Sequence, residues 1–275
     1  MKKYIAYFIL MGLSYSIDLK TEISTKYTSD LHSNETPISL KLNGEYSVDD
    51  IYSEIEIKGS TETEKIELTK VYGESYKDKY TLTFGRQPIV WGNAYIFNKL
   101  NNLTSLNMLN PNEKTATLDG VKMKYSKGNE RVEGIVFDIN DSSDNYAIRY
   151  TNLIGNYELM LNYIKKNTDL KVEGSESAND IILDLKGDLG IGIWTQCAYS
   201  FDNKKNFYLM GIDYSFAINE KTLYLLYEGS YDENKDLFLN YGRYEYGFNE
   251  WNSLKGGLLN QEKNNLLTTT INHKL

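Results

Sequence analysis

The side chains that could carry out acid–base or nucleophilic chemistry are few in this sequence of 275 residues. Hydrolysis by a hydroxyl nucleophile needs a neighbouring base, usually a histidine. The chain has two histidines, His32 beside Ser33 in a polar stretch and His273 in the last alternating segment. It also has one cysteine, Cys197, and no paired histidines, so zinc-binding spacings are absent. The sequence therefore predicts no enzyme, no metal site and no cofactor.

One stretch could hold a charge at a fixed place. Residues 80–84 alternate like a strand and lead into Gly-Arg-Gln-Pro-Ile-Val-Trp-Gly at 85–92. Proline cannot donate to a strand ladder and glycine permits a bulge, so the strand is disturbed near Pro88. The connection from Asn93 to Lys114 is too long for a hairpin, and long connections are usually functional. In a barrel it could fold inward and narrow a passage.

Arg86 would then be a fixed cation near the constriction, with Gln87 and Trp91 beside it. There it could pair with a carboxylate or a passing anion. The alternative is a structural ion pair with an acid of a strand, such as Glu67 or Glu74. The sequence leaves both interpretations open.

The chain is dominated by a two-residue alternation of apolar and polar side chains. Ile148 and Tyr150 alternate with Ala147, Arg149 and Thr151, for example, which gives a strand one apolar and one polar face. The charged residues of these polar faces that we single out as pore-lining candidates are Glu54, Glu56, Lys122, Lys124, Arg149, Glu158, Asp213 and Glu228. Other charged positions on the same faces include Lys20, Glu22, Lys41, Glu45, Lys58 and Asp184.

About fourteen to sixteen such segments of roughly ten residues fill the chain, which is the length of a tilted strand that crosses a bilayer. The chain also has 24 tyrosines, a residue that collects at membrane interfaces. Together these features predict an all-β, transmembrane, antiparallel up-and-down β-barrel over residues 17–275. A soluble β-sandwich is the alternative, but its strands are shorter and carry fewer charges. One short helical piece is expected near Phe97 to Leu106.

Connections of two lengths predict how the barrel is oriented. Those at 49–50, 154–156 and 187–188 are short, as on a periplasmic side. Those at 29–37 and 169–179 are long enough to be extracellular loops.

The N-terminus has the order of a secretory signal peptide, predicted over residues 1–16. Two lysines precede an apolar stretch from Tyr4 to Leu13, and Ser14 and Ser16 supply the small residues before the cleavage point. The chain is therefore expected to leave the cytoplasm.

Residues 64–125 resemble a group of proteobacterial outer-membrane porin-like proteins that includes alginate-export-like channels. In that group a strand ends in Gly-Arg-Gln-x-x-x-Trp-Gly, as residues 85–92 do here, and an Asn-Pro pair follows, as at 110–111. The resemblance implies an outer-membrane β-barrel channel. Leu275 departs from the aromatic residue that often closes such barrels.

These observations predict a channel in the outer membrane of a Gram-negative-type bacterium, through which small hydrophilic solutes diffuse passively. The mixed charges of the polar faces suit a hydrated interior. A barrel that anchors a structural or adhesive surface protein is the alternative. The expected partners are outer-membrane lipid and small polar solutes, with association into a homotrimer left open. The formal net charge of -8 argues against nucleic acid.

Overall fold

A computed structural model shows how these segments are arranged. The residues it describes are 18–25, 28–30, 33–35, 38–60, 65–89, 91–100, 117–137, 145–167, 178–218, 221–247, 252–261 and 264–273. The predicted signal peptide, His32 and residues 101–114 of the long connection lie outside the described residues.

Nearly all of the described chain is β-strand. The strands are β1 (Asp18–Thr25), β2 (Thr28–Asp30), β3 (Ser33–Glu35), β4 (Ile38–Val48), β5 (Ile51–Ser60), β6 (Lys65–Lys77), β7 (Tyr80–Pro88), β8 (Thr117–Lys127), β9 (Glu130–Phe137), β10 (Tyr146–Ile154), β11 (Tyr157–Lys166), β12 (Ala178–Asp188), β13 (Gly192–Ser200), β14 (Lys205–Ile218), β15 (Lys221–Asp232), β16 (Leu237–Gly247), β17 (Asn252–Gln261) and β18 (Asn264–His273). Within the described ranges, no helix is long and apolar enough to cross a membrane.

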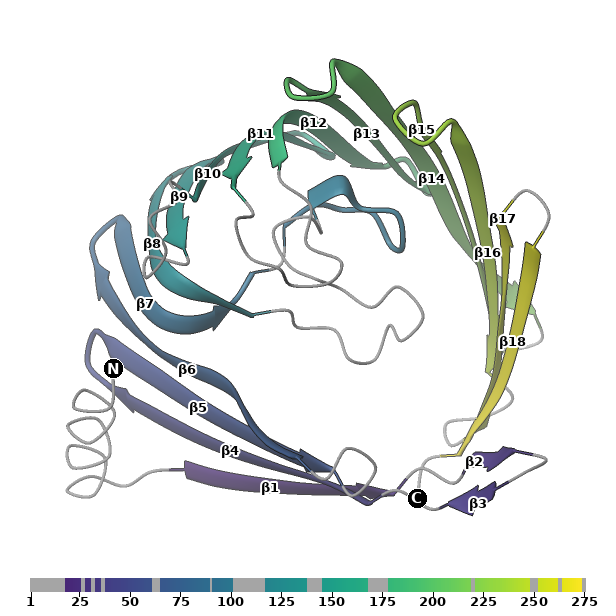
Figure 1. Ribbon diagram of the computed structural model, residues 1–275, viewed down its shortest axis with the longest axis horizontal. Coiled ribbons are helices and arrows are strands. Elements are labelled where there is room, and N and C mark those ends of the chain that lie inside the picture. The colour runs from purple at the N-terminus through teal and green to yellow at the C-terminus, as the bar shows by residue number, and fades with distance from the viewer. Residues whose placement is uncertain are drawn as a thin grey trace. The chain divides into compact units, whose positions relative to one another are not determined.

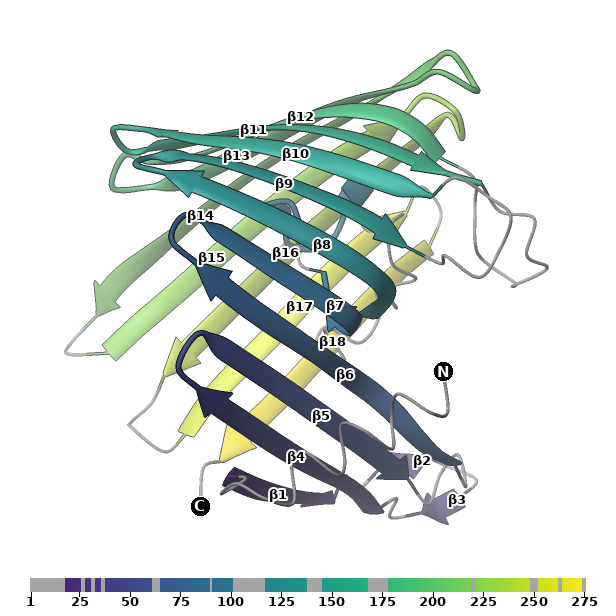
Figure 2. The ribbon, with the colours of Figure 1, turned by 90° about the vertical axis from the view of Figure 1, so that its left-hand side faces the viewer.

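Sixteen of these strands form one antiparallel sheet, in which β1 pairs with β4. From β4 to β18, each strand pairs with the next strand along the chain. Figure 2 shows neighbouring strands such as β10 and β11 running in opposite directions through a tight turn. β2 and β3 form a separate two-stranded hairpin. In the described part of the chain, β1 and β18 each have one paired neighbour, so the ladder is open there. The predicted all-β, up-and-down arrangement and its strand number are confirmed.

Several connections can be compared with their predicted positions. A two-residue turn occurs at 49–50, as predicted, and the short turn predicted at 154–156 occurs at 155–156, because Ile154 ends β10. The turn predicted at 187–188 is wrong, because those residues end β12 and the turn is 189–191. Gly190 adopts a φ of 80° there and donates its N–H to the Asp188 carboxylate at 2.9 Å.

Two further predictions are tested in part. The long connection predicted at 29–37 lies between the paired strands β1 and β4, and it includes most of the β2–β3 hairpin, which begins at Thr28. Of the short helical piece predicted from Phe97 to Leu106, residues 99 and 100 are helical, residues 97 and 98 are not, and the others lie outside the described residues. Of the loop predicted at 169–179, the last two residues belong to β12 and the others are not described.

The chain divides into two compact units. Unit 1 comprises Met1–Ile89, Thr117–Tyr125 and Ile135–Ile139, and unit 2 comprises Val90–Ala116, Ser126–Gly134 and Asn140–Leu275. Most of β8 therefore belongs to unit 1, and β10 to β18 belong to unit 2 (Figure 1).

In unit 2, aromatic rings lie over glycines of the paired strand. Trp194 is the register partner of Gly211, and a Cβ on Gly211 would collide with the Trp194 ring. Tyr244 lies against Gly256, its register partner, in the same way. These glycines are required because the neighbouring ring occupies the space of a side chain.

We expect Gly211→Ala to destabilise the fold by about 1–3 kcal/mol, because the added methyl group overpacks against Trp194. The measurement is urea unfolding of the folded protein in lipid, followed by circular dichroism. The matched control is Gly242→Ala in β16, where a Cβ meets nothing within 4 Å. Equal stability of the two variants would contradict the packing role of Gly211.

Candidate functional site

Many apolar side chains of the sheet are exposed, and many of its polar side chains are buried. On β12 of unit 2, Ile181 and Leu183 are 38% and 46% exposed, whereas Asp180 and Asp184 are 2% and 1% exposed. On β7 of unit 1, Leu82 is likewise exposed next to buried threonines. This is the reverse of a soluble sheet, in which the apolar face is buried. One face of each strand suits lipid, and the other suits a polar interior.

Residues 91–100, which follow β7, lie against the polar face of unit 2; we call them the inner segment. Figure 1 shows the inner segment as a blue ribbon on the concave side of β11 to β15. It has no regular ladder of its own, so its backbone N–H groups need other acceptors. Side chains of the strands supply them.

Glu228 of β15 holds the centre of the inner segment. Its carboxylate accepts the backbone N–H groups of Tyr95, Ile96 and Phe97 at 2.7, 2.9 and 2.7 Å. The indole N–H of Trp194 donates to the same carboxylate at 2.8 Å. Glu228 is fully buried, and four N–H donors compensate for the removal of its charge from water.

Asp184 and Gln196 hold the two ends of the inner segment. Asp184 accepts the backbone and side-chain N–H groups of Asn93, each at 3.2 Å. Gln196 donates to Asp184 at 3.0 Å and accepts the backbone N–H of Lys99 at 2.8 Å. It also donates to Asn98 at 3.0 Å. The register pairs Asp184 with Gln196 across β12 and β13, so both groups act as one anchor.

The Trp-Gly pair of the sequence motif closes the inner segment on itself. The Asn98 side chain donates to the carbonyl of Trp91 at 2.6 Å and accepts the N–H of Leu100 at 3.0 Å. Gly92 has a φ of 87°, and a Cβ there would collide with the Asn98 amide. Glycine is therefore required at this position for both its conformation and its size.

Two arginines of the strands contact aromatic rings of the inner segment. The Arg149 guanidinium lies 5.8 Å from the centre of the Trp91 ring, and the Arg243 guanidinium lies 5.1 Å from that of Tyr95. Tyr241 of β16 stacks on Tyr95 with an angle of 13° between the rings. Such cation–ring contacts add to the hydrogen bonds that hold the segment.

Arg86 and Gln87 are neighbours on β7, and their side chains point to opposite faces. Gln87 is fully buried and donates to the carbonyl of Gly120 at 3.2 Å. Arg86 shares its face with the exposed Phe84 and pairs with Asp119 through two hydrogen bonds of 2.8 and 2.7 Å. The structural ion pair that the sequence left open is thus present, and the position of Arg86 near a constriction stays a prediction. The expected partners, an acid at 67 or 74, are replaced by Asp119.

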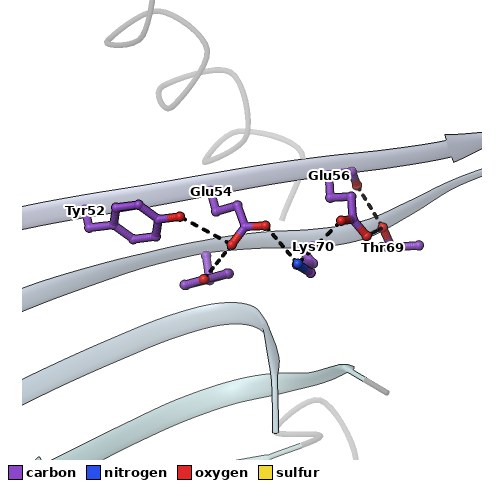
Figure 3. A network of polar contacts seen from close by, with 6 residues as sticks. Tyr52, Glu54, Glu56, Thr69 and Lys70 are labelled. Atoms are coloured by element: carbon purple, nitrogen blue, oxygen red, sulfur yellow. Dashed lines mark hydrogen bonds and ion pairs between the residues drawn. The ribbon is translucent and has the colours of Figure 1, made fainter. Parts of the chain in front are cut away.

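In unit 1, two of the predicted pore-lining acids belong to one polar network (Figure 3). Lys70 of β6 lies 2.8 Å from Glu54 and 3.4 Å from Glu56. Tyr72 donates to Glu54 at 2.6 Å, and Thr69 donates to Glu56 at 2.8 Å. Both carboxylates lie on the polar face of β5, where they are buried and hydrogen-bonded rather than open.

The remaining predicted candidates also lie on polar faces. Lys122 and Lys124 of β8 are half-buried opposite the buried Thr83 and Thr81. In unit 2, Glu158 lies 3.8 Å from Arg131. Asp213 accepts the hydroxyl hydrogen of Tyr224 at 2.7 Å. Their pore-lining role stays a prediction. Within the described residues, no group of three or more His, Cys, Asp or Glu side chains is arranged to hold a metal ion.

Sequence reasoning did not single out Trp194, Gln196, Asn98 or Tyr95. The signal available was the place of Trp194 and Gln196 on the polar face of an alternating strand, where bulky or amide side chains need a partner. Gln196 lies 98 residues from its partner Asn98 in the chain, and Trp194 lies 34 residues from its partner Glu228. No local pattern specifies such contacts.

The arrangement defines a class of fold: an antiparallel up-and-down β-barrel with its apolar face outward and a segment held on its polar face. Solved structures agree. A triple variant of Rhodopseudomonas blastica porin superimposes with a TM-score of 0.62 at 10% sequence identity, over 93% of this chain and 98% of that one. Another variant of the same porin gives a TM-score of 0.61 with the same identity and coverage.

A further structure, from work on engineered proteins with asymmetric conductivity, gives a TM-score of 0.60 at 10% identity. It covers 93% of this chain and 98% of its own. No family model matches the sequence, and no curated protein does. The solved structures and the strand order show that the fold is that of a porin-like transmembrane β-barrel.

We expect Glu228→Gln to free the inner segment, because the amide keeps one acceptor oxygen and loses the charge. The amides of Tyr95, Ile96 and Phe97 should exchange with deuterium about tenfold to a hundredfold faster, since hydrogen bonds to charged groups contribute about 1.5–3 kcal/mol. Amide exchange read by mass spectrometry measures this.

The matched control is Glu233→Gln in the turn after β15. Glu233 accepts the backbone N–H of Asn206 at 2.8 Å, so this variant should speed exchange at Asn206 and leave the inner segment unchanged. Unchanged exchange at 95–97 in the Glu228 variant would show that this carboxylate does not hold the segment.

Proposed function

We propose that this protein is an outer-membrane channel of a Gram-negative-type bacterium that lets small hydrophilic solutes diffuse passively. The single observation that carries the proposal is the inner segment, fixed by buried carboxylates to the polar face of an otherwise outward-apolar sheet. A polar wall with a segment held on it is what a water-filled passage with a narrowing needs.

The proposal includes how the chain sits in its membrane. Residues 1–16 act as the signal peptide and residues 17–275 as one barrel. The short turns face the periplasm and the long connections face outward. Association into a homotrimer is part of the proposal, as is the kinship to alginate-export-like channels supported by the motif at 85–92.

A non-enzymatic role is part of the same proposal. The carboxylate of Glu228 is bonded to backbone N–H groups and to Trp194, and that of Glu54 is bonded to Lys70, so both serve to hold structure. The alternative function, a barrel that anchors a surface protein, predicts a sealed interior.

Conductance across a planar lipid bilayer tests the channel directly. The purified full chain should give discrete current steps. The double variant Asp184→Asn/Glu228→Gln should give larger and noisier steps, because two anchors of the inner segment are weakened.

The charge-matched control is Glu233→Gln/Asp236→Asn, both in the turn between β15 and β16, which should conduct like the natural chain. A folded natural chain that carries no current would overturn the channel and favour the surface anchor. Steps of equal size and noise in both double variants would refute the narrowing role of the inner segment.

A further inference from the structure

The polar face of β16 and β17 carries two cations that share one carboxylate. The Arg243 guanidinium lies 3.0 Å from the carboxylate of Glu245, and the Lys255 ammonium lies 2.7 Å from it. Glu245 and Lys255 are register partners across the two strands. The side chains of Arg243 and Lys255 are 19% and 35% exposed, so solvent reaches both.

Among the residues that the structure describes, both cations keep hydrogen-bond donors without a protein acceptor. A guanidinium carries several N–H donors in a planar fork, and an ammonium carries several on one nitrogen. In the described part of the chain, Glu245 is the one acceptor for Arg243 and for Lys255. Arg86 differs, because its donors are taken by Asp119 and by the carbonyl of Leu68.

Flat aromatic surfaces adjoin these cations. Arg243 lies over the ring of Tyr95, and the ring of Tyr241 stacks on Tyr95 with centroids 6.1 Å apart. Tyr95 is fixed in place because its backbone N–H is bound to Glu228. A planar group can therefore lie beside these rings while its charge meets the cations.

Two other carboxylates lie farther along the sheet: Glu228 on β15, the neighbour of β16, and Asp213 on β14. Glu228 is satisfied by four N–H donors, and Asp213 accepts the hydroxyl of Tyr224 at 2.7 Å. Their charges reduce the attraction for an anion without taking the donors of Arg243 and Lys255. The resulting binding is weak, as it must be for a solute that enters and then leaves.

We infer that Arg243, Lys255, Tyr95 and Tyr241 form a binding site for small carboxylate anions with a planar body. The carboxylate accepts from the guanidinium fork and the ammonium, and the planar body lies beside the tyrosine rings. As the solute class of the channel, this inference rests on the proposed function. The site itself can be tested without any current.

Benzoate is the probe, and saturation-transfer NMR with the detergent-solubilised full chain measures its binding. Neutral benzamide, which has the same shape, should bind about tenfold more weakly than benzoate. Arg243→Gln/Lys255→Gln should weaken benzoate binding at least about tenfold. Lys255→Gln alone, which keeps the Arg243–Glu245 pair, should give an intermediate loss.

The charge-matched control is Lys221→Gln/Lys235→Gln. Both lysines are exposed; Lys221 is the first residue of β15, and Lys235 lies in the turn after that strand. This variant should bind benzoate within about twofold of the natural chain. Equal benzoate affinity in the two double variants, or equal affinity for benzamide, would overturn the site. Benzoate should also reduce the current of the natural chain. Charge-dependent benzoate binding without any current would support the site and refute the channel. Current without charge-dependent binding would support the channel and refute the site.

Discussion

The carboxylate of Glu228 is the acceptor on which the inner segment depends. The segment has no strand or helix ladder, so the N–H groups of three consecutive residues, Tyr95 to Phe97, would otherwise be buried without partners. A carboxylate meets that need better than a neutral group, because charge-assisted hydrogen bonds are the stronger ones. In return, the same donors make a fully buried negative charge tolerable on the strand. Each side of the contact removes the cost of burying the other.

Packing within the sheet positions this carboxylate. The Trp194 ring occupies the space beside Gly211, and its indole N–H reaches Glu228. Gly211 pairs with both Trp194 and Glu228 in the ladder. A side chain at 211 would occupy the space of that ring. The glycine thus acts through two contacts: it admits the indole, and the indole fixes the carboxylate that binds the inner segment. This links a backbone feature of the sheet to the geometry of the candidate narrowing.

The faces of the strands were predictable from sequence, whereas the partners across the polar face were not. Side-chain direction alternates with each residue, so the exposed Ile148 and the buried Arg149 follow from their positions alone. The anchors join residues 91 to 133 positions apart, and nothing local encodes such distances. The partner of Arg86, within the sheet, was equally impossible to predict from local sequence. Its partner, Asp119, lies across the long connection, so the register of β7 and β8 had to be known before the pair could be.

The Arg86–Asp119 pair also shows how charge is tolerated on the apolar face. On that face of β7 and β8, the rings of Tyr80 and Tyr125 contact each other at the turn end, and the exposed Leu82 and Phe84 follow. The ion pair lies at the long-connection end. Six residues of strand separate ring and guanidinium, about 20 Å of strand length. For a strand in a bilayer, a charge is least costly near an interface, and a bidentate pair neutralises it further. In the proposed outer-membrane channel, the ion pair would lie at the opposite membrane boundary from the tyrosines, where the charges meet a polar environment.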